Sequence, residues 1–508
     1  MRFRYPDELI SIPGGDDSEL ILEYDEHRCS VYIKAGKSPE LFELIWKLTP
    51  DEIRREPVKV LGDAWERSYG DLEWKPPEAE RPMPWYFAVS NGSDSLPDRS
   101  GRFTECFGVM TQPDAFCCWK YSGDEIRLLI DIRNGGKPLE AEGKTIRAAD
   151  IVFAEYRDVS AFEALGTYCA EISPAPLKTD RIIYGSNNWY YAYGQTDFEE
   201  FIKDASQTAC FAEGCENRPF AVVDDGWQIN STNPPWTNND RFPELTRLSK
   251  EISSKGDEPG IWVRFLSDER FALDLPDEAR RGKDKKYLDP TNPAVKEHIV
   301  STVKSLVSSG FKLIKHDFSA YDILGGWGKD MGDSAVCCGD GFYDKSKTTA
   351  QVIKEFYRLI LENAGECLIL GCNTVSHLSA GLVHAYRTGD DTSGKEWART
   401  LKMGVNTLAF RLCQNHSFYI CDADCVGITG LIDHRLNREW LKLLSMSGTS
   451  LFVSCKPDIL DKEISADIRN AFKSASRQED ICEPIDWMET KTPSRYMING
   501  KEIKFEWE

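Results

Sequence analysis

Aspartates recur in this 508-residue chain where short apolar runs end, often beside a tryptophan or a cation. Two facing carboxyl groups are the minimal apparatus for cleaving a glycosidic bond, since one acts on the anomeric carbon and one on the leaving oxygen. Carboxylates also accept hydrogen bonds from sugar hydroxyls, and an indole offers an apolar face to a pyranose ring. The residues at these positions are Trp189, Asp224, Asp225, Trp227, Lys315, Asp317, Cys372, Asn373, Arg387, Asp390, Asp391, Asp422 and Asp424.

Each of these residues has a structural alternative. A lone aspartate after a strand is the N-cap of the next helix in roughly two cases of three. That role suits Asp317 less, because Phe-Ser follows it rather than an obvious helix start. Adjacent carboxylates repel one another unless a ligand shares them, which favours a binding role for the doublets 224–225 and 390–391. Taken singly, Trp189 and Trp227 are more often core residues.

Short strands alternate with amphipathic helices from Arg181 onward, and these elements must position the candidate residues. In one unit, Asn292 and a following proline open a helix, and a strand over Phe311 to Ile314 then carries Lys315, His316 and Asp317. For the histidine, a structural role is the more frequent one.

The preceding unit begins with a capping-box pattern, Thr196 and Glu199, and its strand FAVV ends at Asp224. With these two units, eight strands and a suitable length over residues 181–456 predict an α/β (β/α)8 TIM barrel, whose reacting groups project from the C-terminal strand ends. A doubly wound sheet would have the same alternation, but no G-x-G-x-x-G or P-loop follows a strand. The six further strands are Ile182–Gly185, Gly260–Leu266, Cys367–Leu370, Val383–Tyr386, Leu408–Leu412 and Leu451–Ser454.

The segments on either side of the predicted barrel have a different pattern. Short alternating runs separated by Gly, Asn, Asp and Pro predict an N-terminal antiparallel β-sandwich over residues 1–178. Helical periodicity is weak there except over Pro39–Leu48. The barrel is assigned to 179–456, and a short C-terminal region, 457–508, contains a hairpin with an Asn499-Gly500 turn.

Composition excludes several classes of partner. The net charge of -21 disfavours nucleic acid and an anionic membrane surface, and no 18 apolar residues run together. The N-terminus lacks the pattern of a signal peptide and the 16 cysteines lie mostly in core-like runs, so a reducing, cytoplasmic location is expected. The spacing of His416, Cys421 and Cys425 matches no zinc pattern, and we expect no metal or organic cofactor.

At these residues the sequence resembles the α-galactosidases of glycoside hydrolase families 36 and 27, over nearly the whole chain. MPWYFAV, AWERSYGDLEW and IRLLIDIRNGG are similar to the N-terminal β-sandwich of family 36, and AVVDDGWQ is similar to the second barrel strand. YLDPTNPAVKEHIVSTVKSLVSSGFKLIKHDF is similar to the segment that leads to the nucleophile. The resemblance implies retaining cleavage of a terminal α-linked galactose from an α-galactoside substrate.

The resemblance also implies two catalytic residues. Asp317 matches the nucleophile that forms a covalent glycosyl-enzyme, and it must be ionised to attack, which Lys315 would favour. Asp391, four residues after Arg387, matches the acid/base and must hold a proton before it can act. Asp390 is the runner-up for that role. A retaining pair predicts carboxyl groups about 5–5.5 Å apart.

The substrate-binding residues follow from the same resemblance. Asp224 and Asp225 match the pair that grips O4 and O6 of galactose, and Lys315 matches a lysine that reaches O3 and O4. Trp189 matches a ring-stacking tryptophan, and Arg387 matches a sugar-contacting arginine. The remaining substrate-binding candidates are Trp227, Cys372, Asn373, Asp390 and Asp424, the last with Asp422 in a D-A-D segment.

The sequence also departs from the family. GCNTVSHLSAGL lacks the family's double-glycine pattern, so Asn373, Ser376 and His377 leave open whether the sugar is galactose or N-acetylgalactosamine. Phe-Ser follows the nucleophile in place of Met-Asn-Arg. An α-N-acetylgalactosaminidase, a galactosyl transferase of the raffinose-synthase kind and a non-catalytic sugar-binding protein are the alternatives. Family members often assemble through N-terminal domains, and the sequence leaves homo-oligomer formation open.

Overall fold

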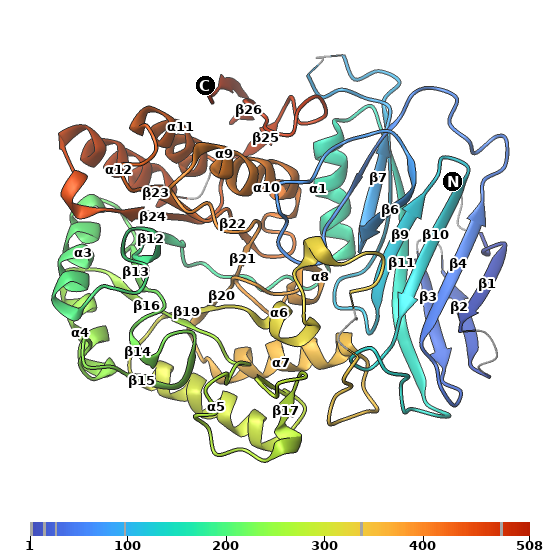
Figure 1. Cartoon of the computed structure of the whole chain (residues 1–508). Coiled ribbons are helices and arrows are strands. Elements are labelled where there is room, and N and C mark those ends of the chain that lie inside the picture. The colour runs from blue at the N-terminus through green and yellow to red at the C-terminus, as the bar shows by residue number, and fades with distance from the viewer. Residues whose placement is uncertain (1–3, 14–16, 26–27, 96–97, 336–338, 478–480) are drawn as a thin grey trace.

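The computed structural model describes residues 4–13, 17–25, 28–95, 98–335, 339–477 and 481–508. In Figure 1 the N-terminal third forms antiparallel sheets on one side, in blue and cyan. A parallel sheet with its helices occupies the other side, in green to red. The chain therefore has the mixed α/β composition that the sequence predicts.

The N-terminal residues form two antiparallel sheets. Their strand orders are β1-β4-β10-β9-β6 and β2-β3-β11-β8-β7-β5. The strands are β1 (Glu8–Ile12), β2 (Glu19–Tyr24), β3 (Arg28–Lys34), β4 (Leu41–Lys47), β5 (Lys59–Gly62), β6 (Glu78–Pro84), β7 (Tyr86–Ser90), β8 (Phe103–Val109), β9 (Phe116–Tyr121), β10 (Glu125–Asp131) and β11 (Thr145–Arg157).

Aromatic rings join the two sheets face to face. Trp119 of the five-stranded sheet lies 5.8 Å from Phe87 and 6.1 Å from Phe153 of the six-stranded sheet, between ring centroids. The helix expected over Pro39–Leu48 is instead strand β4. It pairs with both β1 and β10, and its buried Phe42, Leu44 and Trp46 alternate with the period of a strand.

The parallel sheet has nine strands in the order β22-β21-β20-β19-β16-β13-β12-β24-β23. Its terminal strands, β22 and β23, are separated in the chain by Ala423 and Asp424 alone. The strands are β12 (Tyr184–Asn187), β13 (Phe220–Val223), β16 (Glu258–Val263), β19 (Leu313–His316), β20 (Leu368–Gly371), β21 (Ala385–Arg387), β22 (Ile420–Asp422), β23 (Cys425–Ile428) and β24 (Leu451–Cys455).

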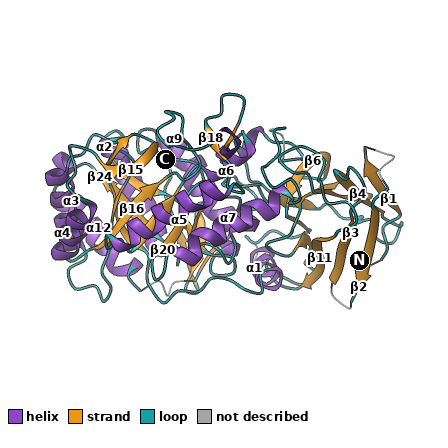
Figure 2. Ribbon diagram, turned by 90° about the horizontal axis from the view of Figure 1, so that it is seen from below, coloured by secondary structure: helices purple, strands orange, loops and turns teal. Residues whose placement is uncertain are grey.

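Helices cover the outside of this sheet, as Figure 2 shows for α3, α4, α5 and α7. Asn292 caps α5 and Pro293 begins it, as predicted. The capping box of α3 is formed by Asp197 and Glu200, one residue after the predicted pair. The helices are α1 (Ala161–Ile172), α2 (Trp189–Ala192), α3 (Phe198–Phe211), α4 (Leu245–Lys255), α5 (Pro293–Ser308), α6 (Ser319–Leu324), α7 (Thr349–Asn363), α8 (Ser376–Ser379), α9 (Trp397–Thr400), α10 (Thr407–Arg411), α11 (His434–Ser445) and α12 (Lys462–Ala475).

One predicted strand is wrong. Leu408–Leu412 lies mostly in helix α10, and the strands at this point of the sheet are β22 and β23. A five-residue run that is mostly apolar fits a buried helix as well as a buried strand, because periodicity does not separate the two at this length.

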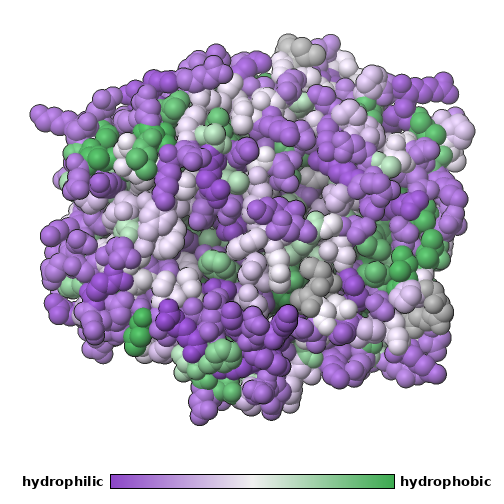
Figure 3. Space-filling view, in the orientation of Figure 1, coloured by the Kyte–Doolittle hydropathy of each residue, from purple (hydrophilic) through white to green (hydrophobic). Residues whose placement is uncertain are grey.

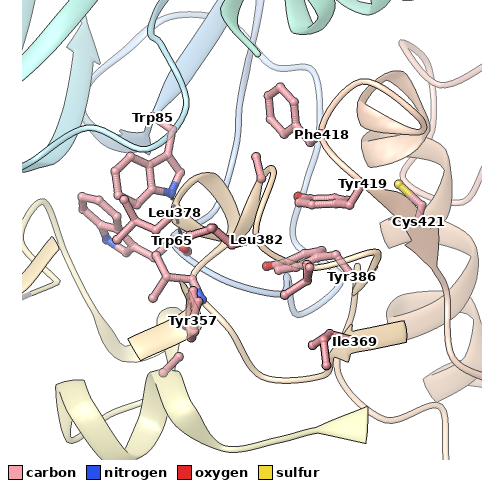
Figure 4. Packing of buried hydrophobic residues seen from close by; sticks show 14 of the residues in the cluster. Trp65, Trp85, Tyr357, Ile369, Leu378, Leu382, Tyr386, Phe418, Tyr419 and Cys421 are labelled. Carbon is pink, nitrogen blue, oxygen red and sulfur yellow. Dashed lines mark hydrogen bonds between the residues drawn. The ribbon is translucent and has the colours of Figure 1, made fainter. Parts of the chain in front are cut away.

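The N-terminal sheets pack directly on the helical side of the chain. Figure 4 shows Trp65 and Trp85, from the N-terminal residues, beside Leu378 of α8 and Tyr357 of α7. The Trp85 ring stacks on that of His377 with a centroid distance of 5.3 Å and an interplanar angle of 6°. A buried ion pair of 2.8 Å joins Asp63 to Arg411 across the same interface.

The last residues add a small antiparallel sheet of β25 (Cys482–Pro484), β26 (Arg495–Ile498) and β27 (Lys501–Lys504). The predicted hairpin is confirmed, since Asn499 and Gly500 both have positive φ in the turn between β26 and β27. The face of the molecule in Figure 3 is mostly hydrophilic, with small hydrophobic patches. None of the helices in the described ranges combines the length and apolar character that crossing a bilayer requires.

Candidate active site

Lys315 and Asp224 form the centre of a charged cluster at the carboxyl ends of the parallel strands. Lys315 Nζ lies 2.7 Å from Asp224 Oδ2, and both side chains are buried. Burial lowers the pKa of Lys315, but the neighbouring groups, Asp224 above all, together raise it, so the pKa lies well above its ordinary value. Asn187 donates a second hydrogen bond, of 2.6 Å, to the same oxygen of Asp224. The ion pair is therefore fixed in position.

Asp317 follows β19 directly, and its carboxylate is half-buried. The indole N–H of Trp262 donates to Oδ2 at 3.1 Å, and the backbone N–H of Phe318 donates to Oδ1 at 2.7 Å. Asp317 thus has one donor on each oxygen and retains acceptor capacity on both. Lys315 and Asp317 also interact electrostatically, which places this carboxylate in the same cluster.

Arg387, at the end of β21, connects two further aspartates. Its Nη2 lies 2.9 Å from Asp391 Oδ1 and 2.8 Å from Asp424 Oδ2. Burial lowers the pKa of Arg387, but its neighbours, Asp424 first and Asp391 among the others, together raise the guanidinium pKa well above its ordinary value. Asp424 is also bonded by the hydroxyl of Tyr190 and by the N–H and hydroxyl of Thr392. Asp424 therefore fixes the position of the Arg387 guanidinium.

Asp390 and Asp391 have different surroundings although they are adjacent. Asp390 lies between two guanidinium groups, with Arg67 and Arg399 each at 2.9 Å. The Asp391 side chain is 41% exposed, against 20% for Asp390, and forms an ion pair with Arg387, so it is the member of the doublet that a ligand can reach. Burial raises the pKa of Asp391, but Arg387 and then Arg67 outweigh this effect, and its pKa is lowered from the ordinary value.

Asp225 and Cys372 lie beside the cluster. Asp225 is buried and accepts hydrogen bonds from Gln228, from the hydroxyl of Ser231 at 2.6 Å and from the N–H of Thr232 at 2.8 Å, so its carboxylate is engaged within its own loop. The Cys372 thiol lies 3.5 Å from Arg387 Nη1, and burial raises its pKa well above the ordinary value. Cys372 is therefore a neutral neighbour of the charged groups.

Two residues expected to bind substrate lie elsewhere. Trp227 is fully buried, its N–H donates to the Trp262 carbonyl at 3.0 Å, and it packs near Trp236, so it offers no face to a ligand. Asn373 is fully buried, and its amide donates to Glu66. Both expectations are corrected here, because strand-end position alone does not fix the direction of a side chain. Trp189 is half-buried, with its ring 5.3 Å from that of Tyr193.

The loop after β20 faces the N-terminal sheets rather than the charged cluster. Ser376 donates to the Ala64 carbonyl at 3.1 Å, and His377 Nε2 lies 2.6 Å from the Val109 carbonyl. The expectation that these two residues help to select the sugar is therefore wrong. Asp422 is buried next to Asp424, whose N–H it accepts at 3.2 Å, and burial raises the pKa of Asp422.

His316 lies between Lys315 and Asp317 in sequence, but its side chain points away from the charged cluster. Its ring is buried among Phe265, Phe356 and Tyr357, and burial lowers its pKa to about 3. The histidine is thus neutral and structural, as the sequence favoured. Within the described ranges, no group of three or more His, Cys, Asp or Glu side chains could hold a metal ion.

The sequence did not reveal that the N-terminal residues reach this site. Glu66 is fully buried and accepts from Asn373, from the hydroxyl of Tyr69 and from the N–H of Gly328 at 2.8 Å. Arg67 contacts Asp390. Adjacent charged residues within the otherwise apolar and aromatic AWERSY segment were the available signal, because buried charges require partners.

Three-dimensional comparison relates nearly the whole chain to solved α-galactosidases. TtGalA from Thermus thermophilus, in complex with p-nitrophenyl α-D-galactopyranoside, has a TM-score of 0.64 at 16% identity, covering 99% of this chain and 98% of that one. A family 36 AgaA variant from Geobacillus stearothermophilus, in complex with 1-deoxygalactonojirimycin, has a TM-score of 0.62 at 13% identity, covering 95% and 71%. These identities establish a shared fold. No protein-family model matches the sequence, and neither does any curated protein.

Proposed function

We propose that this protein is a retaining α-glycoside hydrolase that removes terminal α-linked galactose, with Asp317 as nucleophile and Asp391 as acid/base. The observation that carries the proposal is the convergence of Asp224, Lys315, Asp317, Arg387 and Asp391 at the carboxyl edge of one parallel sheet. The fold shared with α-galactosidases supports the same activity.

The reaction would proceed by double displacement. An oxygen of Asp317 attacks the anomeric carbon, the glycosidic bond breaks, and Asp391 gives its proton to the leaving oxygen. Asp391 then accepts a proton from water, the water oxygen attacks the anomeric carbon, and the bond to Asp317 breaks. The two hydrogen bonds on Asp317 hold its carboxylate in one orientation for the attack.

The acid step places a requirement on substrate binding. Without a ligand, Arg387 and Arg67 favour the carboxylate form of Asp391, whereas a general acid must hold a proton. A bound sugar that takes over hydrogen bonds of Arg387 and excludes water from Asp391 would raise the pKa of this carboxyl. We therefore assign Arg387 two functions, sugar contact and control of Asp391.

Sugar recognition would rest on the Lys315–Asp224 ion pair and on the ring of Trp189. Asp224 accepts from two side chains at Oδ2, and Lys315 has three N–H donors, so the pair can bond adjacent hydroxyls of the sugar. Trp189 would stack on the apolar face of the pyranose. Asp225 is engaged within its own loop, and its contribution would be to fix Asp224 from the adjacent position.

The architecture that serves this function is also part of the proposal. We infer that the parallel sheet closes as a (β/α)8 barrel whose seventh strand is broken into β22 and β23. The two antiparallel sheets would form the β-sandwich domain, residues 1–178. The barrel would span 179–456, and 457–508 would form the C-terminal extension.

The proposal is tested with Asp317→Asn, Asp391→Asn and a matched control, Asp257→Asn, a buried aspartate before β16. Both site variants are expected to lose at least about 100-fold in kcat/KM on a nitrophenyl α-galactoside, while the control retains activity. A slow fluorinated α-galactoside should label wild type, with mass spectrometry placing the sugar on Asp317. Full activity in Asp317→Asn would refute the mechanism.

The same assay distinguishes galactose from N-acetylgalactosamine as the bound sugar, and hydrolysis from transfer to an acceptor sugar. A nitrophenyl α-galactoside is compared with its N-acetylamino analogue, and products are analysed with and without an acceptor sugar. We expect galactose to be preferred and hydrolysis to exceed transfer. Preference for the N-acetylamino substrate would reassign the sugar without changing the roles of Asp317 and Asp391.

A further inference from the structure

The N-terminal segment 63–69 runs beside the turn that carries Asp391. Ser68 donates its N–H to the Thr388 carbonyl at 2.9 Å and accepts the N–H of Asp390 at 3.1 Å, which makes a parallel bridge between Ser68 and Gly389. The segment is anchored at its start by the buried Asp63–Arg411 ion pair. The backbone just before Asp391 is therefore held by residues more than 300 positions away in sequence.

Gly389 lets the opposite side of the same turn lie close to residues 403–407. A side-chain carbon at residue 389 would lie 2.1 Å from the Met403 carbonyl oxygen and 2.6 Å from the Thr407 hydroxyl. The turn is thus compressed between the N-terminal segment on one side and residues 403–407 on the other. A backbone packed on both sides has little freedom to move, so the position of Asp391 depends on both neighbours.

Arg67 adds a side-chain contact to the backbone bridge. Its Nη2 lies 2.9 Å from Asp390 Oδ1, and the second oxygen of Asp390 is 2.9 Å from Arg399 Nη2. Arg399 also donates through Nε to the Asp391 carbonyl. Asp390 is therefore held from two sides, and the direction in which the next residue leaves the turn is fixed.

The Arg67 guanidinium is itself held in place by rings. It lies 5.0 Å from the Trp327 ring centroid and 5.8 Å from that of Tyr69, and its side chain is 8% exposed. Trp327 in turn stacks near Tyr321, at 4.4 Å. The buried Nε of Arg67 has no hydrogen-bond partner among the described residues, so one donor of this side chain remains for a bound ligand or water.

Several charges act on Asp391 besides Arg67. Arg387 is in direct contact, Lys315 and Arg399 contribute as further cations, and Asp391 in turn acts on Tyr190. The adjacent Asp390 and the Arg387 partner Asp424 are the acidic neighbours. Arg67 follows Arg387 as the second-largest cationic influence on Asp391. Removing Arg67 would therefore change both the place and the charge environment of this carboxyl.

We infer that Arg67 is a positioning residue for Asp391: through Asp390 and the Ser68 bridge it holds the turn that presents the acid/base, so the active site is complete only with segment 63–69 in place. The inference rests on the proposed function for its kinetic consequence. The contacts of Arg67 and Ser68 with the 388–390 turn do not depend on that function.

The experiment uses the full chain with Arg67→Met, Arg67→Lys and the control Arg102→Met, another buried N-terminal arginine, near Asp94 at 3.6 Å. Two substrates are compared, a nitrophenyl α-galactoside and an α-galactosyl disaccharide. The disaccharide has the poorer leaving group and depends more on acid assistance. Arg67→Met should lose about 100-fold in kcat/KM on the disaccharide and about tenfold or less on the aryl substrate, since general acid catalysis typically contributes 10²–10⁴-fold.

The pH profile supplies a readout that a purely structural role would not change. Loss of the Arg67 charge should move the limb assigned to Asp391 to higher pH, because a nearby cation favours the carboxylate. Arg67→Lys should restore part of that shift and part of the disaccharide activity. Arg102→Met should keep the wild-type ratio between the two substrates and the wild-type profile.

Crystal structures separate this inference from the proposed function. If wild type cleaves no α-galactoside, the proposed function fails, and the structures of wild type and Arg67→Met still decide the positioning role. Displacement of the 388–391 turn, with loss of the Arg387–Asp391 contact, would support it. An unmoved turn, or equal losses on both substrates with an unchanged pH profile, would overturn it. If Arg67→Met does not fold, Arg67→Lys carries the same comparisons.

Discussion

Nη2 of Arg387 lies 2.9 Å from Oδ1 of Asp391. The same nitrogen lies 2.8 Å from Oδ2 of Asp424, whose side chain is 2% exposed, whereas that of Asp391 is 41% exposed. The Arg387 guanidinium therefore contacts two carboxylates. The buried Asp424 carboxylate fixes its position, and the exposed Asp391 carboxylate can be reached by a ligand. This arrangement makes Asp424 a support for the site.

Asp424→Asn should destabilise the protein and weaken the site together. Removing one partner of a buried ion pair costs about 3–5 kcal/mol when the other is left uncompensated, and Arg387 would keep Asp391 as a partner. We expect a loss near the lower value, because the asparagine keeps the hydrogen bonds from Thr392 in part. Urea unfolding measures the stability. Asp458→Asn, on the surface, is the control, and equal stability of the two variants would contradict the prediction.

Lys315 and Asp224 should behave as one unit. Lys315→Met or Asp224→Asn alone leaves a buried charge without its partner, at about 3–5 kcal/mol. The double variant removes both charges, so its loss should be smaller than the sum of the single losses. A double-mutant cycle in denaturant measures the difference. Additive losses would show that the 2.7 Å contact is energetically unimportant.

Asp257 should make stability depend on pH. Burial raises its pKa from 3.8 to about 8, partly offset by Arg218, and neither carboxyl oxygen has a hydrogen-bond partner among the described residues. Between about pH 4 and pH 8 the folded state keeps a proton that the unfolded state releases, so this residue's contribution to stability falls as pH rises. Asp257→Asn removes the effect.

The measurement is the melting temperature of wild type and Asp257→Asn at pH 5 and pH 8. Wild type should lose stability relative to the variant between these values, by at most about 1.4 kcal/mol per pH unit. A constant difference between the two proteins across the range would show that Asp257 does not titrate in this window.

Substitution of the two tryptophans should affect different properties, stability for Trp227 and substrate binding for Trp189. Trp227→Ala removes a fully buried indole and should cost about 3–5 kcal/mol of unfolding free energy. Trp189→Ala removes a half-buried ring and should raise KM about tenfold, equivalent to roughly 1.4 kcal/mol, with a small stability change. Unfolding curves and initial rates on a nitrophenyl α-galactoside measure both effects. The reverse assignment would restore Trp227 as a sugar platform.

Local signals predicted the elements that carry the main charged residues. The Asn292-Pro293 helix start, the strand FAVV and the Asn499-Gly500 turn were all found as expected, because caps, strand runs and turns depend on neighbours in sequence. Since parallel strands end at one edge, the sequence also placed Lys315 near Asp224. The short run Leu408–Leu412 was misassigned, because only its packing made it a helix.

The sequence by itself determined which residue types stand at the strand ends: Asp224, Lys315, Asp317, Arg387 and Asp391. The tertiary structure decided which way the side chains point and which distant groups meet them. Asn373 turns to Glu66 and Trp227 to the Trp262 carbonyl, while Arg67 reaches Asp390 from another part of the chain. The physical reason is that a buried polar group needs a partner, and those partners lie far away in sequence.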